Sequence, residues 1–238
     1  MHSVEALVRW DHPIRGLLYP NSFLDLVEKF GLMPTLTRVV LDQALDQAAA
    51  WHAQGQQLTV AVNLSASSLV DSDLPRQVAS MLAARNLLPG ALQLEITEEF
   101  LMADRNRARV ILTRLRSHGV KISIDDYGTG YSSLTCLRDL PIEELKLDRS
   151  FIFPMADDVR AAALVASTIA LAHGLGLRMV AEGVETHVAY TELAALGCDQ
   201  AQGYYTSRPV PAAELDYLLR NRRSANKLTD SPPITGLG

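Results

Sequence analysis

The chain alternates short apolar runs with amphipathic stretches along most of its 238 residues. Strands separated by helices are typical of repeated βα units around a parallel sheet. Strands are expected at 4–9, 58–63, 92–97, 120–125, 144–147 and 177–182, with a weak one at 199–201. Helices are expected at 34–54, 104–118, 161–173 and 211–221. The pattern predicts an α/β fold, a TIM-like βα barrel, with a doubly wound open sheet as the alternative.

Composition excludes several classes of protein. With 48% hydrophobic residues the chain can bury a substantial core, and its net charge of −5 without a Lys/Arg-rich run argues against a nucleic acid polymer as partner. The spacing of Cys136 and Cys198 indicates neither a disulfide framework nor a thiolate zinc site. Neither a membrane segment nor a secretion signal is recognised, so we expect a cytoplasmic chain, although the full-length protein could be membrane-anchored.

Side-chain alternation along the expected strands separates two faces. One face is apolar, whereas the other carries polar groups toward the carboxyl end of each run. In a βα barrel the apolar face packs on the outer helices, and active sites gather at the carboxyl ends of the strands. The residues expected to converge there are Glu5, Arg9, Asn63, Glu95, Asp125, Lys146 and Glu182.

The adjacent carboxylates of Asp125 and Asp126 sharpen this expectation. Alone, such a pair is also typical of a turn followed by a helix cap. Gathered with three glutamates and an amide oxygen, it would be repulsive without cations, and oxygen ligands suit Mg²⁺ or Mn²⁺. Two such ions would favour phosphodiester hydrolysis. The rival enzyme class is a Schiff-base enzyme that uses Lys146, which the excess of carboxylates disfavours.

The same residues lie in motifs that resemble the EAL-domain cyclic di-GMP phosphodiesterases of bacteria. The matching segments are Glu5-Ala6-Leu7, Val62-Asn63-Leu64-Ser65, Glu95-Ile96-Thr97-Glu98, Asp125-Asp126-Tyr127-Gly128-Thr129-Gly130, Leu145-Lys146-Leu147-Asp148, Ala181-Glu182-Gly183-Val184-Glu185 and Gln202-Gly203-Tyr204. They run through almost the whole chain in the family's order. Tyr127 replaces the commoner phenylalanine.

The resemblance implies roles for these residues. One ion would be held by Glu5, Asn63, Glu95 and Asp125, and the second by Asp125, Asp126 and Glu182. Lys146 would orient or deprotonate the attacking water, and Glu185 is assigned to the catalytic group. Arg9, Gln202 and Asp126 would contact the substrate, and Glu98 would tether the loop that follows Asp126.

The resemblance also implies a reaction and partners. Cyclic di-GMP would be hydrolysed to linear pGpG with two Mg²⁺ or Mn²⁺ ions, Ca²⁺ would inhibit, and a homodimer is expected. The alternative is a catalytically weak EAL domain that acts as a cyclic di-GMP receptor. No Gly-Gly-Asp-Glu-Phe segment is present in this chain, so synthesis of the dinucleotide is not expected of it.

The beginning of the chain departs from the family pattern. The family's first antiparallel strand is not found before Glu5, so we expect an N-terminally truncated EAL domain over residues 1–221. The polar segment 222–238 contains Pro232-Pro233 and is expected to be a disordered tail. Sensory or cyclase domains could precede this domain in the full-length protein.

Overall fold

A computed structural model describes residues 3–98, 105–130 and 134–219. The chain divides into one compact unit, Met1–Ser207, and a second unit, Arg208–Gly238. In the second unit a helix is described at 212–219, where a helix was expected over 211–221. The tail expected at 222–238 lies outside the described residues.

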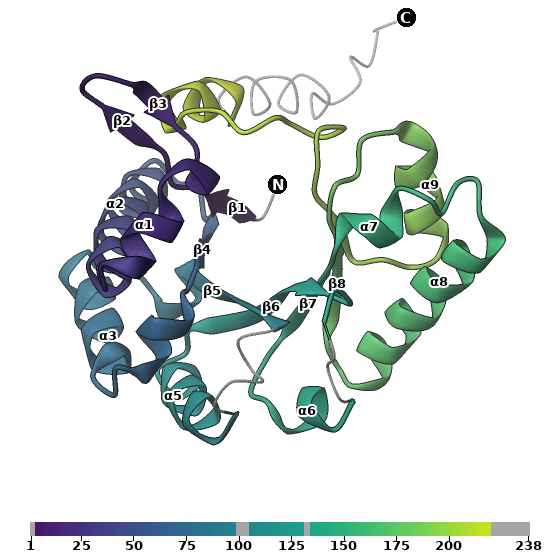
Figure 1. Cartoon of the computed structure of the whole chain (residues 1–238), viewed down its shortest axis with the longest axis horizontal. Helices are drawn as coiled ribbons and strands as arrows, with labels where there is room; N and C mark the ends of the chain where they lie inside the picture. The colour runs from purple at the N-terminus through teal and green to yellow at the C-terminus, as the bar shows by residue number, and fades with distance from the viewer. Residues whose placement is uncertain (1–2, 99–104, 131–133, 220–238) are drawn as a thin grey trace, which may run out of the picture. The chain divides into compact units, whose positions relative to one another are not determined.

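A curled parallel sheet organises the first unit (Figure 1). The strands follow the order β1 (Ser3–Ala6), β4 (Thr59–Asn63), β5 (Leu92–Thr97), β6 (Lys121–Tyr127), β7 (Glu144–Leu147), β8 (Arg178–Ala181) and β9 (Gln200–Ala201). Within the described residues all pairings of this sheet are parallel, and none joins β9 to β1. The predicted barrel-like α/β class is confirmed, in the form of an open half-barrel.

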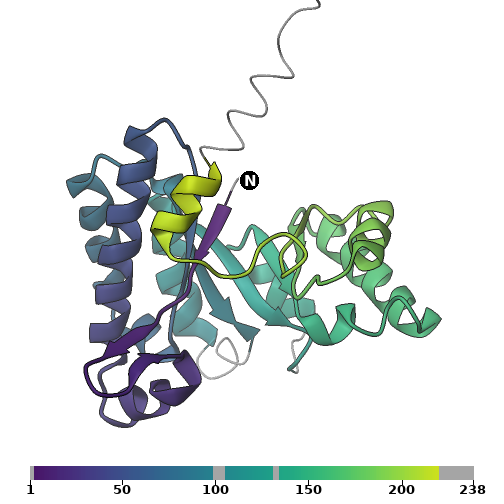
Figure 2. The same ribbon diagram turned by 90° about the horizontal axis from the view of Figure 1, so that it is seen from above.

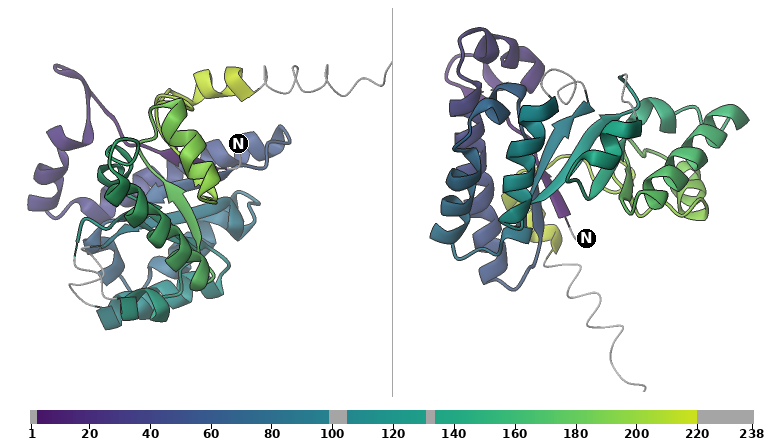
Figure 3. Two further views of the ribbon diagram at one scale, coloured as in Figure 1. Left: turned by 90° about the vertical axis from the view of Figure 1, so that its right-hand side faces the viewer. Right: turned by 90° about the horizontal axis from the view of Figure 1, so that it is seen from below.

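Helices lie along the outer face of this sheet (Figure 1). They are α1 (Leu24–Lys29), α2 (Met33–Ala53), α3 (Leu74–Ala84), α5 (Arg105–Ser117), α6 (Leu134–Asp139), α7 (Arg149–Ile152), α8 (Val159–Gly174) and α9 (His187–Ala195). Figures 2 and 3 show α2, α3 and α5 side by side, and α8 beside α9. In the described part of the chain, no helix combines the length and the apolar character that a membrane crossing requires.

Burial follows the alternation predicted from the sequence. The outward side chains of the central strands, such as Leu94, Ile122 and Leu145, are fully buried against the helices. Each contributes about 2 kcal/mol to stability through apolar burial. The inward side chains Glu95 and Lys146 are equally buried but polar. The sheet therefore has an apolar outer face that forms the core and a polar inner face.

The first predicted strand is shorter than expected. The ladder between β1 and β4 ends at the pair Ala6 and Val62. The chain then enters an antiparallel hairpin of β2 (Trp10–His12) and β3 (Gly16–Leu18), in which Trp10 packs edge-on against Phe23. Of the single strand predicted over 4–9, the structure confirms 4–6, whereas residues 7–9 leave the sheet and lead into the hairpin.

A solvent-exposed contact through Asp199 links the end of α8 to β8. The Asp199 carboxylate accepts hydrogen bonds from the Met179 backbone N–H at 2.8 Å and pairs with His173 Nε2 at 2.9 Å. Partial burial opposes ionisation of Asp199, but the Met179 N–H, His173 and Arg178 outweigh it and lower the pKa of this carboxyl. The lowered pKa makes this contact dependent on pH.

Asp199→Asn should lower the melting temperature at pH 7 by about 2–4 °C, which corresponds to about 1 kcal/mol for a group with this exposure. Because the folded-state pKa lies below the unfolded one, this stabilisation is present above the unfolded pKa, near 4, and disappears as pH falls through the folded value. Thermal melts of the wild type and the variant between pH 7 and pH 3 test this. The exposed Asp157→Asn is the control, and a pH-independent difference would contradict the prediction.

Candidate metal centre

Seven polar side chains meet at the carboxyl end of the inner face. They are Glu5 on β1, Asn63 on β4, Glu95 on β5, Asp125 and Asp126 on β6, Lys146 on β7, and Glu182 directly after β8. Parallel pairing places them at one edge, since Asn63 is the register partner of Glu95. The alternation of the strands then turns most of them toward the same side.

Lys146 lies at the centre of this group. Its side chain is only 2% exposed, and Nζ lies 2.7 Å from Glu182 Oε1 and 3.0 Å from both Glu95 Oε2 and Asp125 Oδ1. A fourth carboxylate oxygen, Oε2 of Glu5, lies 3.7 Å away. One ammonium group therefore faces four carboxylates, three on strands and the fourth directly after β8.

The carboxylates form two groups that share one member. Oxygens of Glu5, Glu95 and Asp125 lie within 4.8 Å of one another, and so do oxygens of Asp125, Asp126 and Glu182. The family resemblance assigns carboxylates of the first group to one ion and those of the second group to another. Asp125 is the member common to both groups.

Burial and mutual repulsion disturb the ionisation of this group. Burial raises the pKa of Glu95 well above its usual range, and Lys146 only partly offsets this effect. Burial and the neighbouring Asp125 also raise the pKa of both Glu182 and Asp126. For Lys146, burial acts to lower the pKa, but the surrounding carboxylates outweigh it and raise the pKa. A single ammonium cannot compensate so many carboxylates, and the remaining negative charge favours a divalent cation.

The residues present fit a hard divalent cation. The ligand atoms that the acidic residues offer are all oxygens, which Mg²⁺ and Mn²⁺ prefer. Oδ1 of Asp125 is buried and makes no hydrogen bond of suitable geometry, although Lys146 Nζ lies 3.0 Å away. Glu5 is held by two amides, because Asn63 Nδ2 donates to Oε1 at 2.8 Å and Gln202 Nε2 donates to Oε2 at 2.6 Å.

The position of Asp126 depends on an irregularity in β6. Strict alternation would turn it to the outer face, opposite to Asp125. Instead, Asp126 has a left-handed φ of +53°, and the register of β6 against β7 shifts between Ile124 and Tyr127. Aspartate tolerates this conformation better than most residues. The irregularity brings the Asp126 carboxylate to the group that contains Glu182.

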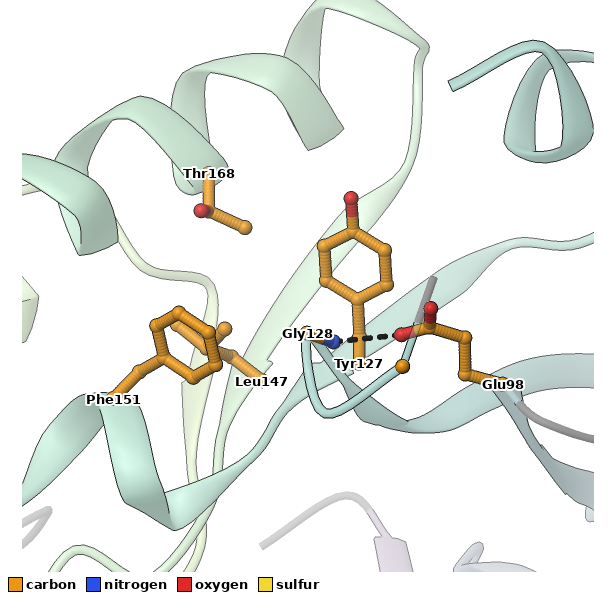
Figure 4. A pocket seen from close by; sticks show the side chains of 7 residues that line it. Glu98, Tyr127, Gly128, Leu147, Phe151 and Thr168 are labelled. Carbon is orange, nitrogen blue, oxygen red and sulfur yellow. Dashed lines mark hydrogen bonds between the residues drawn. The ribbon is translucent and has the colours of Figure 1, made fainter. Parts of the chain in front are cut away.

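The loop after Asp126 is held from two sides (Figure 4). Oε2 of the buried Glu98 accepts a hydrogen bond from the Gly128 N–H at 2.8 Å. On the other side, a Cβ on Gly128 would lie 2.5 Å from the Phe151 ring, so this position, with φ of +99°, requires glycine. A pocket of about 190 Å³ lies between these groups and Thr168 of α8. Glu98 is the residue expected to tether this loop, whereas Phe151 lies in none of the motifs that pointed to the site.

Among the described residues, two predicted site residues, Arg9 and Glu185, are not linked to the acidic cluster. This cluster consists of Glu5, Glu95, Asp125, Asp126 and Glu182. Nη1 of Arg9 donates to the Val8 carbonyl, and its guanidinium lies 4.7 Å from the centre of the Tyr19 ring. Glu185 is exposed. Within the described residues, no hydrogen bond or ion pair links either of them to the acidic cluster.

A second polar layer lies beneath the acidic one. Nε2 of the buried Gln93 donates to Glu144 Oε1 at 2.6 Å and to Ser123 Oγ at 3.1 Å, and Arg178 pairs with Glu144 at 3.2 Å. These residues were not among the predicted site residues. The available signal was their spacing, because Gln93, Ser123 and Glu144 each lie two residues before Glu95, Asp125 or Lys146 on the same face.

Known proteins that are similar to this chain share one domain family. The EAL domain family matches residues 1–209. Two proteins of Pseudomonas aeruginosa are similar to this chain. The bifunctional diguanylate cyclase/cyclic di-GMP phosphodiesterase MucR is 46% identical over 90% of this chain and 32% of its own length. The cyclic di-GMP phosphodiesterase NbdA is 42% identical over 100% of this chain and 30% of its own length. The chain thus spans about a third of the length of these curated relatives.

A solved structure agrees with the fold. The phosphodiesterase PaMucR in complex with c-di-GMP superposes with a TM-score of 0.86 at 46% identity, covering 90% of this chain and 87% of that one. Together with the motifs and the acidic edge of the sheet, these matches show that the chain belongs to the EAL domain family.

Proposed function

We propose that this domain hydrolyses cyclic di-GMP to linear pGpG and requires two divalent cations, Mg²⁺ or Mn²⁺. The observation that carries the proposal is the convergence of five carboxylates at one edge of the sheet, four of them around Lys146. An anionic phosphodiester would be repelled by this cluster without cations. When bound, two divalent cations supply the Lewis-acid charge needed for in-line attack of water on phosphorus.

The proposed roles follow the two carboxylate groups. Glu5, Asn63, Glu95 and Asp125 would hold one cation, and Asp125, Asp126 and Glu182 the other. Asn63 can bind the cation through its side-chain carbonyl oxygen, because its amide nitrogen already donates a hydrogen bond to Glu5. Asp126 would also contact the substrate.

The remaining residues would position the substrate and the attacking water. Lys146, at the centre of the carboxylates, would orient the water through its ammonium group. It could take the proton of that water only after bound cations had neutralised the carboxylates and the amine had become neutral. Gln202 donates a hydrogen bond to Glu5, and in this proposal it would also contact the substrate. The guanidinium of Arg9, which lies over the Tyr19 ring, would bind a substrate phosphate through its N–H groups, and Glu185 would approach only in the substrate complex.

The Schiff-base alternative receives no support from the position of Lys146. A nucleophilic lysine needs a lowered pKa so that the neutral amine forms. Four carboxylate oxygens within 3.7 Å of Nζ favour the ammonium instead.

The direct test is hydrolysis of cyclic di-GMP by EDTA-stripped protein, with pGpG separated by chromatography. We expect no product without metal and full activity with Mn²⁺ or Mg²⁺. Ca²⁺ should bind but support turnover poorly, because it accepts looser ligand geometry. Protein that binds the dinucleotide without turnover under every metal condition would instead be a receptor, and hydrolysis unaffected by EDTA would contradict the two-cation proposal.

The same sample addresses the proposed homodimer. Sedimentation with and without Mn²⁺ and substrate measures the oligomeric state. A monomer under all conditions would remove this part of the proposal.

A further inference from the structure

The β2–β3 hairpin brings a tyrosine to a predicted substrate-binding residue. Its antiparallel register pairs Trp10 with Leu18. Continued by one residue, the same register places Arg9 opposite Tyr19. Side chains directly opposite each other on an antiparallel pair lie close enough to interact. Arg9 also lies only three residues after Ala6, where β1 ends, so the hairpin connects Tyr19 to the edge of the sheet that carries the acidic cluster.

The contact between these two side chains leaves most of the guanidinium edge available. The Arg9 guanidinium lies over the Tyr19 ring, 4.7 Å from its centre, which is within the range of a cation–π interaction. Stacking uses the flat face of the guanidinium and not the N–H groups at its edge. Nη1 donates to the Val8 carbonyl at 2.8 Å, and among the described residues no carboxylate pairs with Arg9. The other N–H groups can therefore bind an anion.

The backbone around Tyr19 is held in place by its neighbours. Tyr19 is extended, with φ of −89° and ψ of 157°, as is usual for a residue that precedes a proline, here Pro20. Its carbonyl accepts a hydrogen bond from the Ser22 N–H at 2.9 Å. On the facing strand, Trp10 packs edge-on against the buried Phe23. The Tyr19 ring itself is 58% exposed, so it contributes little to the core and its replacement should not unfold the domain.

We infer that Tyr19 is a positioning residue for substrate binding: its ring holds the Arg9 guanidinium ready to bind a phosphate of the dinucleotide. The inference rests on the proposed function, because it depends on the phosphate contact proposed for Arg9. An arginine side chain loses rotamer freedom when it binds a ligand, and a guanidinium already held by a ring loses less. Such a contact strengthens binding of substrate and transition state alike, so it lowers KM and leaves kcat unchanged.

The test compares two variants of Tyr19. Tyr19→Leu replaces the ring by an apolar side chain without π electrons, whereas Tyr19→Phe keeps the ring. We expect Tyr19→Leu to raise KM for cyclic di-GMP about three- to tenfold, the effect of losing one cation–π contact, with kcat within about twofold of the wild type. Tyr19→Phe should keep KM within about twofold of the wild type. Unchanged KM in Tyr19→Leu, or an equal rise in Tyr19→Phe, would overturn the inference.

A double-mutant cycle separates this role from a general effect on the hairpin. Arg9→Gln alone should raise KM, and addition of Tyr19→Leu should raise it no further, because Tyr19 acts through the guanidinium. An equal effect of Tyr19→Leu in both backgrounds would overturn the inference. Leu17→Ala is the matched control, because Leu17 lies on β3 of the same hairpin and is 57% exposed. Its KM should equal that of the wild type, and a rise as large as that of Tyr19→Leu would count against the inference.

Binding without turnover gives a second readout. Calorimetry with cyclic di-GMP and Ca²⁺, which should support turnover poorly, measures Kd, and Tyr19→Leu should raise Kd by about the same factor as KM. If the wild type binds and hydrolyses the dinucleotide and Tyr19→Leu does so equally well, this inference alone fails. If the wild type neither binds nor hydrolyses it, the proposed function fails, and the inference fails with it.

Discussion

Asp125→Asn should reduce hydrolysis of cyclic di-GMP by about a thousandfold or more, the range seen when a central electrostatic group is removed from an active site. Asp125 belongs to both carboxylate groups, and its Oδ1 is buried without a hydrogen bond of suitable geometry. Asparagine keeps the shape but removes the negative charge that a shared position between two cations requires. Both Mn²⁺ affinity and turnover should therefore fall, as measured by calorimetry and by pGpG formation.

The control for this prediction is Asp157→Asn, an exposed acid outside the cluster that should retain wild-type turnover. Turnover of Asp125→Asn within about threefold of the wild type, at the same Mn²⁺ concentration, would show that Asp125 does not bridge two cations.

Lys146→Met should lower turnover by about a hundredfold or more at saturating Mn²⁺, because a group that orients water or takes its proton contributes this much. Mn²⁺ affinity should change much less than turnover, because Lys146 is not a proposed metal ligand. A variant that binds metal as the wild type does and reacts more slowly cannot be explained by loss of the metal site. Single-turnover rates measured over a range of Mn²⁺ concentrations give both quantities from one preparation.

Lys121→Met serves as the comparison, with wild-type turnover expected, because Lys121 lies on β6 and its Nζ donates to the Thr59 hydroxyl at 3.0 Å rather than to an acid. If Lys146→Met retained wild-type turnover once saturated with metal, Lys146 would have no part in activating water.

The sequence predicted the central strands well because the physical signal there is strong. The structure begins and ends β5 and β7 at the residues expected, since each run alternates buried apolar and inward polar side chains. The convergence of Glu5, Glu95, Asp125 and Glu182 followed from the same alternation. Strand parity is a local property, so it can be read without knowledge of the tertiary contacts.

Features that depend on distant partners were not predictable in this way. The three-residue strands of the β2–β3 hairpin are too short to show an alternating pattern. Asp126 joins the cluster through its left-handed φ, which alternation cannot foresee. The packing of Phe151 on Gly128 and the distances around Lys146 arise only when separate βα units meet.

The hydrogen bond between Glu5 and Gln202 has a consequence for folding. These residues are 197 positions apart, and they join β1, at one edge of the sheet, to the segment that follows β9 at the other. A contact between such distant parts of the chain carries a large loop-closure entropy, so it forms late, after the central strands have paired. A cation bound by Glu5 would then stabilise an interaction that is absent from the folding transition state. We therefore expect metal to slow unfolding much more than it accelerates folding, which would make the loaded domain long-lived rather than fast-folding.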